Sequence, residues 1–150
     1  MDDQENSERI LVGVDGSPSS IEALRRGARI AKAFDAPLEA VTTWEFPTAL
    51  DGFYYPAPEW SPESDAHQIL STAVEQAFPD GPPDKFTTTT LQGAPARVLI
   101  TESEHAGMLV LGSRGHGGFA GLLLGSVSGA CAEHAHCPVL IMHSKDAKPE

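Results

Sequence analysis

The chain has 150 residues, of which 41% are hydrophobic, and this size and composition are typical of a single globular, soluble domain. Its 21 acidic and 10 basic residues give a formal net charge of −11. This balance argues against nucleic acids and anionic membranes as partners, because both require a basic surface. No apolar run approaches the roughly 20 residues of a membrane-spanning helix. The acidic segment 1–8 is unlike a secretory signal, so we expect a cytoplasmic protein.

Apolar runs and segments of helical spacing alternate along the chain. Strands are predicted at residues 10–14, 38–44, 86–91, 108–111 and 139–142, and helices at 18–33, 61–78, 95–105 and 126–135. This alternation indicates βαβ units, and therefore an α/β fold in which helices cover both faces of a parallel sheet. In such sheets the ligand binds outside the carboxyl ends of the strands, where the strand order reverses.

The whole chain, 1–150, is expected to form one domain with an acidic N-terminal tail (1–8) and a polar C-terminal tail (143–150). One long loop, 45–61, interrupts the alternation, and six of the ten aromatic residues lie in the window 44–60. Loops of this length are usually functional or disordered, and the aromatic content argues against disorder. The loop covers a ligand, docks a partner or packs over the sheet edge, and all three roles stay open.

The strongest functional signal lies between the fourth strand and the last helix. The strand 108–111 ends at Gly112, a glycine-rich loop follows, and a helix then begins at Gly125-Ser126. Glycine allows backbone N–H groups to approach an anion closely, and the first turn of a helix adds unpaired donors and a positive dipole end. The stretch therefore predicts a phosphate cradle, and hence a nucleotide site. Asp15 follows the first strand and is expected to lie in the same crevice.

Other phosphate-binding motifs fit less well. No Gly-Lys-Ser/Thr occurs, so the chain has no Walker lysine to contact the β- and γ-phosphates. Residues 115–120 fit the loose dinucleotide fingerprint, but they come late in the chain, which disfavours NAD. Ser17, His116 and Asp15 could be drawn as a catalytic triad, but no pattern places them within hydrogen-bond reach in the required order. We therefore predict no catalytic residue.

The two cysteines raise the question of a metal site. Cys131, His134, His136 and Cys137 are close in the sequence and resemble a set of zinc ligands. However, Cys137 precedes Pro138, where the helix must already have ended, so the four side chains are not expected to converge. We expect two reduced, mostly buried thiols and no metal.

Three blocks of the sequence resemble the universal stress protein family. The spacing Gly112-x2-Gly115-x9-Gly125-Ser126 matches the nucleotide signature of that family. The block Ile10–Ser17 matches its opening segment, and Gly93-x-Pro95 matches a third block. The resemblance covers the chain from Arg9 to Met142. One departure is Gly107, where the family often has Asp, at the end of the sheet far from the expected pocket.

The resemblance implies a Rossmann-like fold, with a five-stranded parallel sheet in the order 3-2-1-4-5, an ATP pocket and a homodimer. It places Asp15 on the adenosine side and gives the backbone of Val41 to the adenine edge. It also assigns to the site the residues of the glycine signature and of the helix start: Gly112, Arg114, Gly115, Gly125, Ser126, Val127 and Ser128. The side chain of Arg114 lies within the motif without being part of it.

The leading hypothesis is an ATP-binding module in a stress response, with or without Mg²⁺, that acts as a homodimer and through an unknown protein partner. The strand 139–142 is apolar on both faces and lies at a sheet edge in the implied order, so it is the expected dimer contact. The alternative is a slow ATPase in the same pocket, for which Arg114 and Asp15 are the only nearby groups. A dimeric scaffold without nucleotide is a third reading, which the intact signature disfavours.

Overall fold

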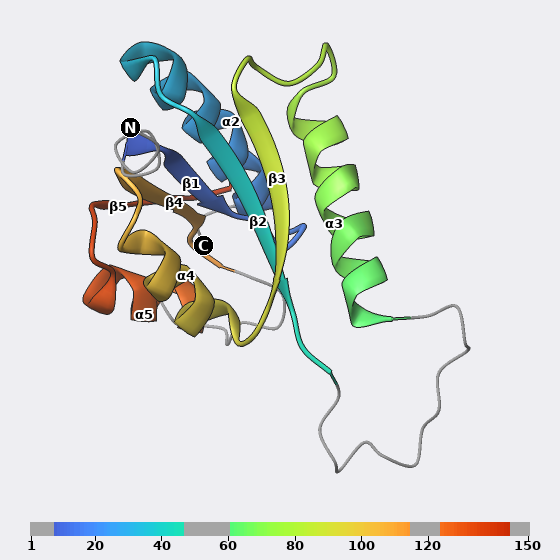
Figure 1. The fold of residues 1–150 in the computed structure, drawn as a ribbon, viewed down its shortest axis with the longest axis vertical. Coiled ribbons are helices and arrows are strands. Elements are labelled where there is room, and N and C mark those ends of the chain that lie inside the picture. Colours follow the sequence, from blue (N-terminus) through green and yellow to red (C-terminus); the bar gives the residue numbers. More distant parts are fainter. Residues whose placement is uncertain (1–7, 47–60, 115–123, 145–150) are drawn as a thin grey trace, which may run out of the picture.

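The computed structural model describes residues 8–46, 61–114 and 124–144. In these ranges five strands alternate with four helices (Figure 1). The elements are β1 (Ile10–Gly13), α2 (Pro18–Phe34), β2 (Leu38–Trp44), α3 (Pro62–Ala77), β3 (Phe86–Gln92), α4 (Pro95–Ser103), β4 (Met108–Gly112), α5 (Ser126–His134) and β5 (Val139–Met142). Each predicted strand and helix is present, and no bound differs from the predicted one by more than two residues.

The five strands form one sheet in the order β3-β2-β1-β4-β5, and every neighbouring pair is parallel. This confirms the predicted 3-2-1-4-5 order and the edge position of the threonine-rich strand β3. The chain runs outward from β1 to β3 and then returns to add β4 and β5 on the other side. The strand order therefore reverses between β1 and β4, which is where ligands bind in sheets of this kind.

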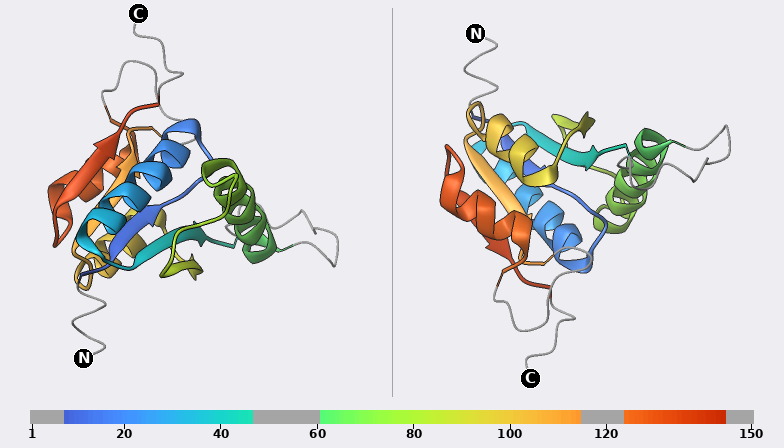
Figure 2. Two further views of the ribbon diagram at one scale, coloured as in Figure 1. Left: turned by 90° about the horizontal axis from the view of Figure 1, so that it is seen from above. Right: turned by 90° about the horizontal axis from the view of Figure 1, so that it is seen from below.

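Helices cover both faces of the sheet, as predicted (Figure 2). Each face has its own core. Because side chains alternate along a strand, neighbouring residues of β1 and β4 enter different cores. Val12 and Val110 pack with α2 and α3, whereas Leu11 and Leu109 pack with α4 and α5. All four side chains are fully buried. No described helix is long and apolar enough to cross a membrane.

The starts of α2 and α3 follow from the sequence. Ser17 and Ser61 precede the prolines that begin these helices, and each serine hydroxyl accepts a hydrogen bond from a first-turn amide, at 3.3 Å from Ser20 and 3.0 Å from Ser64. A serine cap satisfies one of the unpaired N–H groups at a helix start, and proline fits the first helical position. The caps fix where α2 begins relative to the carboxyl end of β1.

Charged side chains join the elements at the amino end of the sheet. Arg9, just before β1, forms ion pairs with Glu39 of β2 and with Glu102 of α4, the latter at 3.1 Å. The Thr89 hydroxyl of β3 donates to the Glu39 carboxylate at 2.6 Å. These contacts tie three elements together at the end of the sheet opposite the predicted site.

A glycine in the middle of α2 lets this helix lie close to the sheet. A Cβ atom at Gly27 would be 2.7 Å from the Val12 Cγ2 atom and 3.3 Å from the Leu38 Cδ1 atom. Both of these side chains are buried in the sheet and have little room to move. By contrast, a Cβ atom at Gly129 in α5 would meet nothing within 4 Å.

The two glycines are therefore expected to respond in opposite ways to alanine. Gly27→Ala should lower the free energy of unfolding by about 1–3 kcal/mol, because overpacking outweighs the gain in helix propensity. Gly129→Ala should raise it by about 0.5–1 kcal/mol, because alanine restricts the unfolded chain without a clash. Urea unfolding followed by circular dichroism measures both changes. A stabilised Gly27→Ala variant would contradict the close helix–sheet contact.

Candidate functional site

The candidate site lies at the carboxyl ends of β1 and β4, where the strand order reverses. After β1 the chain turns through Asp15 and Gly16 into α2, and Gly16 has a φ of 85°. The Asp15 Oδ1 atom accepts a hydrogen bond from the Ser17 amide at 2.9 Å. Glycine favours this left-handed backbone, and the aspartate stabilises the turn. The Asp15 carboxylate thus stands at the start of α2 and already has one backbone donor.

The end of β4 touches the first turn of α2. A Cβ atom at Gly112 would lie 2.3 Å from the Ser19 Oγ atom and 2.7 Å from the Ser20 amide nitrogen. Because the helix backbone is part of this contact, it cannot be relieved by rotating one side chain. Gly112 therefore has a packing role in addition to the phosphate-site role that the sequence predicts.

Ser113 connects β4 to both β5 and α5. Its amide donates to the Met142 carbonyl at 2.7 Å, and its carbonyl accepts from the Gly125 amide at 2.7 Å and from the Ser128 hydroxyl at 3.0 Å. Ser113 and Ser128 are both buried. The Gly125 amide and the Ser128 hydroxyl, which the sequence places at the ligand, thus also join the two sides of the glycine loop.

The first turn of α5 differs from the starts of α2 and α3 because no side chain of the described residues caps it. Its N-cap residue is Gly125, and the exposed Ser126 and half-buried Val127 follow. The first amides of a helix have no partner within the helix. Backbone donors and the positive end of the helix dipole are therefore available to an anion at this point.

Val41 and Arg114 lie on either side of the strand reversal. Val41 of β2 pairs with Gly13 of β1, and its side chain is 1% exposed. The Val41 carbonyl accepts a hydrogen bond from the Val14 amide at 2.8 Å. The Arg114 side chain is exposed, and its carbonyl accepts from the Ser19 hydroxyl at 2.7 Å. Gly115 and His116 lie outside the described residues.

The structure therefore brings most of the described candidate residues together. Hydrogen bonds and close contacts join Gly112, Arg114 and the start of α5 to one another through Ser113 and Ser19, and Asp15 lies in the adjoining turn. Val41 is set apart, inside the neighbouring strand pair. Ser19 and Ser113 were not predicted. A hydroxyl residue in the first helical turn, following an Asp-Gly turn, is the signal that could have indicated Ser19.

Two members of the candidate triad, Ser17 and Asp15, bond to the backbone at the start of α2, and the third, His116, lies outside the described residues. The Ser17 hydroxyl caps α2, and the Asp15 oxygen described above bonds to the Ser17 amide rather than to a histidine. In the described ranges, no group of three or more His, Cys, Asp or Glu side chains could hold a metal ion.

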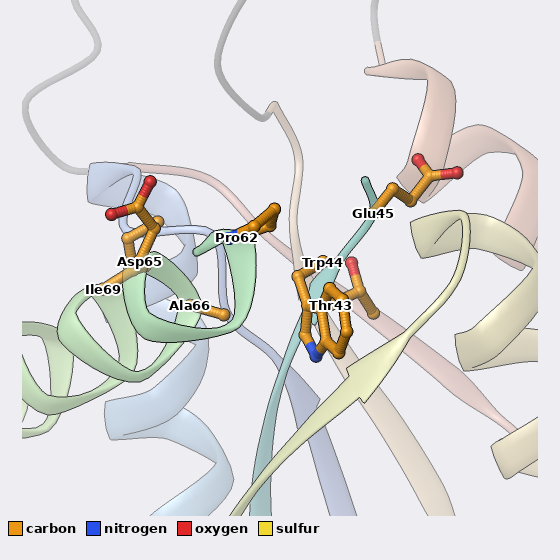
Figure 3. A pocket seen from close by; sticks show the side chains of 7 residues that line it. All are labelled: Thr43, Trp44, Glu45, Pro62, Asp65, Ala66 and Ile69. Atoms are coloured by element: carbon orange, nitrogen blue, oxygen red, sulfur yellow. The ribbon is translucent and has the colours of Figure 1, made fainter. Parts of the chain in front are cut away.

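A separate open pocket of about 340 Å³ lies between the end of β2 and the start of α3 (Figure 3). The aromatic ring of Trp44 stands on one side and Pro62 and Ala66 of α3 on the other, as Figure 3 shows. Glu45 and Asp65 add carboxylates to its lining. None of the sequence-predicted site residues lines this pocket, so it is distinct from the candidate site at the ends of β1 and β4.

Together, the doubly wound sheet and the uncapped, glycine-bordered helix start define the chain as a Rossmann-like α/β protein. Comparison with known proteins agrees: the Universal stress protein family matches residues 6–143. The chain belongs to the universal stress protein family. It is 35% identical over 133 residues to Universal stress protein Rv2623 of Mycobacterium tuberculosis, covering 88% of this chain and 44% of that protein. The chain spans about half the length of the curated relatives it matches.

Solved structures support the same fold. A universal stress protein crystallised in complex with cAMP is 30% identical, with a TM-score of 0.69 over 92% of this chain and 98% of the other. UspA from Lactobacillus plantarum is 19% identical and has a TM-score of 0.71, covering 91% of this chain and 98% of the other. The second similarity concerns the fold alone, whereas the first includes a relative with a bound nucleotide.

The two cysteines have different surroundings. Cys131 of α5 is fully buried in the core between this helix and the sheet, and this burial raises the pKa of its thiol to about 11. Cys137 is half-buried, and desolvation raises its pKa above the ordinary value as well. Both thiols are free in the structure.

Iodoacetamide labelling of the folded protein should therefore be slow and ordered. With a pKa near 11, about 0.1% of Cys131 is thiolate at pH 8, so it should react only when the protein unfolds. Cys137 should react first, and its rate should rise with pH because the thiolate is the reactive form. Mass spectrometry of peptides measures both rates. The denatured protein, in which both cysteines should react, is the control. Equal labelling rates of Cys131 and Cys137 in the folded protein would contradict the burial of Cys131.

Proposed function

We propose that this chain binds an adenine nucleotide, ATP above all, at the carboxyl ends of β1 and β4, and acts as a homodimeric regulatory module in a stress response. The observation that carries the proposal is the start of α5 at Gly125, which has no side-chain cap and is joined to the end of β4 through Ser113. A relative 30% identical to this chain was crystallised with cAMP, which also contains an adenine and a phosphate.

The phosphates would be held by local donors. The chain carries a net charge of −11, so long-range attraction does not bring an anion to the site. The first-turn amides of α5, at Ser126 and Val127, and the exposed Ser126 hydroxyl are donors of the type that bind phosphate at helix starts. Ser128 would contribute its amide, because its hydroxyl bonds to Ser113.

The nucleoside would lie toward β1 and β2. Asp15 stands at the end of β1, where a carboxylate can accept hydrogen bonds from ribose hydroxyl groups, and Val41 lies in the adjacent strand. Mg²⁺ bound with ATP takes most of its ligands from phosphates and water. Asp15 is the described carboxylate at this edge that could add one more oxygen.

Gly125→Val should weaken ATP binding by well over tenfold, because the valine side chain would enter the space of the phosphate oxygens. We expect the same effect from Gly115→Val, in the same signature. Gly129→Val is the matched control, since Gly129 lies one turn further along α5 and its Cβ position is open. Isothermal titration calorimetry with ATP measures the affinities. Unchanged affinity in both signature variants would overturn the site.

Binding without turnover distinguishes the proposal from the slow-ATPase alternative. The sequence has no Walker lysine, and the Asp15 Oδ1 atom accepts a hydrogen bond from the Ser17 amide. Phosphate release within the roughly 1–10³ s⁻¹ range of typical enzymes, lost on Asp15→Ala, would support the alternative instead.

The homodimer is proposed to form through β5. This strand has Leu140 and Met142 packed in the α2 face and Val139 and Ile141 in the α5 face, and all four side chains are only partly buried. An apolar edge strand with open backbone groups favours association unless it is covered. A second copy of β5, related by a two-fold axis, would cover it in an antiparallel pair.

The register identifies the residue to change. The carbonyls of Pro138 and Met142 accept from the amides of Leu109 in β4 and of Ser113 just after it. By alternation, Ile141 directs its amide to the open edge. Ile141→Pro should therefore remove a cross-dimer hydrogen bond and shift the protein toward monomer. Leu140→Pro is the contrast, because it interrupts the β4 ladder and should lower stability. Analytical ultracentrifugation at micromolar concentration measures the mass; a monomeric wild type would refute the dimer.

A further inference from the structure

Two buried serine hydroxyls hold two consecutive carbonyls at the point where the chain leaves β4. Ser19 of α2 donates to the Arg114 carbonyl at 2.7 Å, and Ser128 of α5 donates to the Ser113 carbonyl at 3.0 Å. The exposed fractions of the two serines are 4% and 3%. The donors come from helices on opposite faces of the sheet, so the strand end is fixed from both sides.

The contact at Ser19 is specific to this position. The missing side chain of Gly112 leaves the space that the Ser19 hydroxyl occupies. The Ser19 Oγ atom also lies 3.5 Å from the Arg114 amide nitrogen, which can donate to it. A single hydroxyl thus contacts both backbone polar groups of Arg114, which lies between the first two glycines of the signature.

The orientation of this peptide bears on anion binding. A carbonyl oxygen carries partial negative charge and repels a phosphate, whereas an amide attracts it. Because the Ser19 hydroxyl donates to it, the Arg114 carbonyl is directed at α2.

We propose that Ser19 is a positioning residue for the phosphate part of the nucleotide site: its hydroxyl holds the Arg114 carbonyl toward α2 and so prevents this peptide from turning its oxygen to the phosphates. The inference rests on the proposed nucleotide function. Ser19 acts through the backbone of Arg114 and is not itself a ligand. The role concerns the phosphates and not the nucleoside.

Ser20 provides a matched control in the same helical turn. Its exposed fraction is 3%, close to that of Ser19, but its hydroxyl donates to the Ser17 carbonyl at 2.9 Å within the start of the same helix. Ser19→Ala and Ser20→Ala each remove one buried hydroxyl from the first turn of α2. Both should lower stability to a similar extent, but only Ser19→Ala releases the Arg114 peptide.

The test compares the two variants by calorimetry with ATP and with adenosine, well below the melting temperature of either variant. Ser19→Ala should raise the Kd for ATP by about tenfold, in the range expected when a buried carbonyl loses its donor. The Kd for adenosine should stay within twofold. Ser20→Ala should leave both affinities within twofold.

Three results would contradict the inference, and they distinguish its failure from the failure of the proposed function. An unchanged Kd for ATP in Ser19→Ala, with the wild type binding normally, would overturn the positioning role and leave the proposed function intact. If Ser19→Ala raised the Kd for ATP and the Kd for adenosine equally, or if Ser20→Ala raised the Kd for ATP as much as Ser19→Ala does, Ser19 would have only a general role in stability. A wild type that binds neither ligand would overturn the proposed function and this inference together. Faster amide exchange at Ser113 and Arg114 in Ser19→Ala than in Ser20→Ala would then still show that the hydroxyl holds the strand end.

Discussion

The contact between the carboxyl end of β4 and the first turn of α2 determines where the other parts of the site lie. It is possible only because Gly112 has no side chain, so that the Ser19 hydroxyl can lie against the strand. Next to this contact, Arg114 is hydrogen-bonded to α2, and Ser113 is hydrogen-bonded to the start of α5 and to the end of β5. Four elements thus meet within three consecutive residues, at the place where a parallel sheet of this topology binds its ligand.

The polar groups at this edge are buried with little penalty because each finds a partner in the backbone. Burying a hydroxyl is unfavourable unless it is hydrogen-bonded. The Ser19, Ser20 and Ser128 hydroxyls all donate to carbonyls. Thr42 does the same, donating to the Val14 carbonyl at 2.8 Å. Short hydroxyl side chains therefore give the carboxyl edge a fixed shape without placing a charge in the interior.

Most of the fold could be predicted because its signals are local. The apolar run 108–111, the serine-proline helix starts and the alternation of elements each lie within a few residues of the structure they specify. The strand order came from the family resemblance, and the structure confirms it. Helix ends were less accurate: α4 ends at Ser103 rather than His105, since no glycine or proline marks its end.

The site could be predicted only in part, because its hydrogen bonds join residues that are distant in the sequence. Ser19 and Arg114 are 95 positions apart, and neither the glycine signature nor helical spacing indicates that they meet. For the same reason the sequence does not indicate that the Ser128 hydroxyl donates to the Ser113 carbonyl, 15 positions away. Whether Asp15, Val41 and the start of α5 contact a ligand stays a prediction.

The bond from the Ser113 amide to the Met142 carbonyl has a thermodynamic consequence. Ser113 belongs to the proposed nucleotide site, and Met142 ends the strand proposed to form the dimer. If occupancy of the site shifts the end of β4, the free energy of dimerisation changes with it. Linkage then requires the reverse effect, in equal amount: the apparent nucleotide affinity would vary with the concentration of the protein itself.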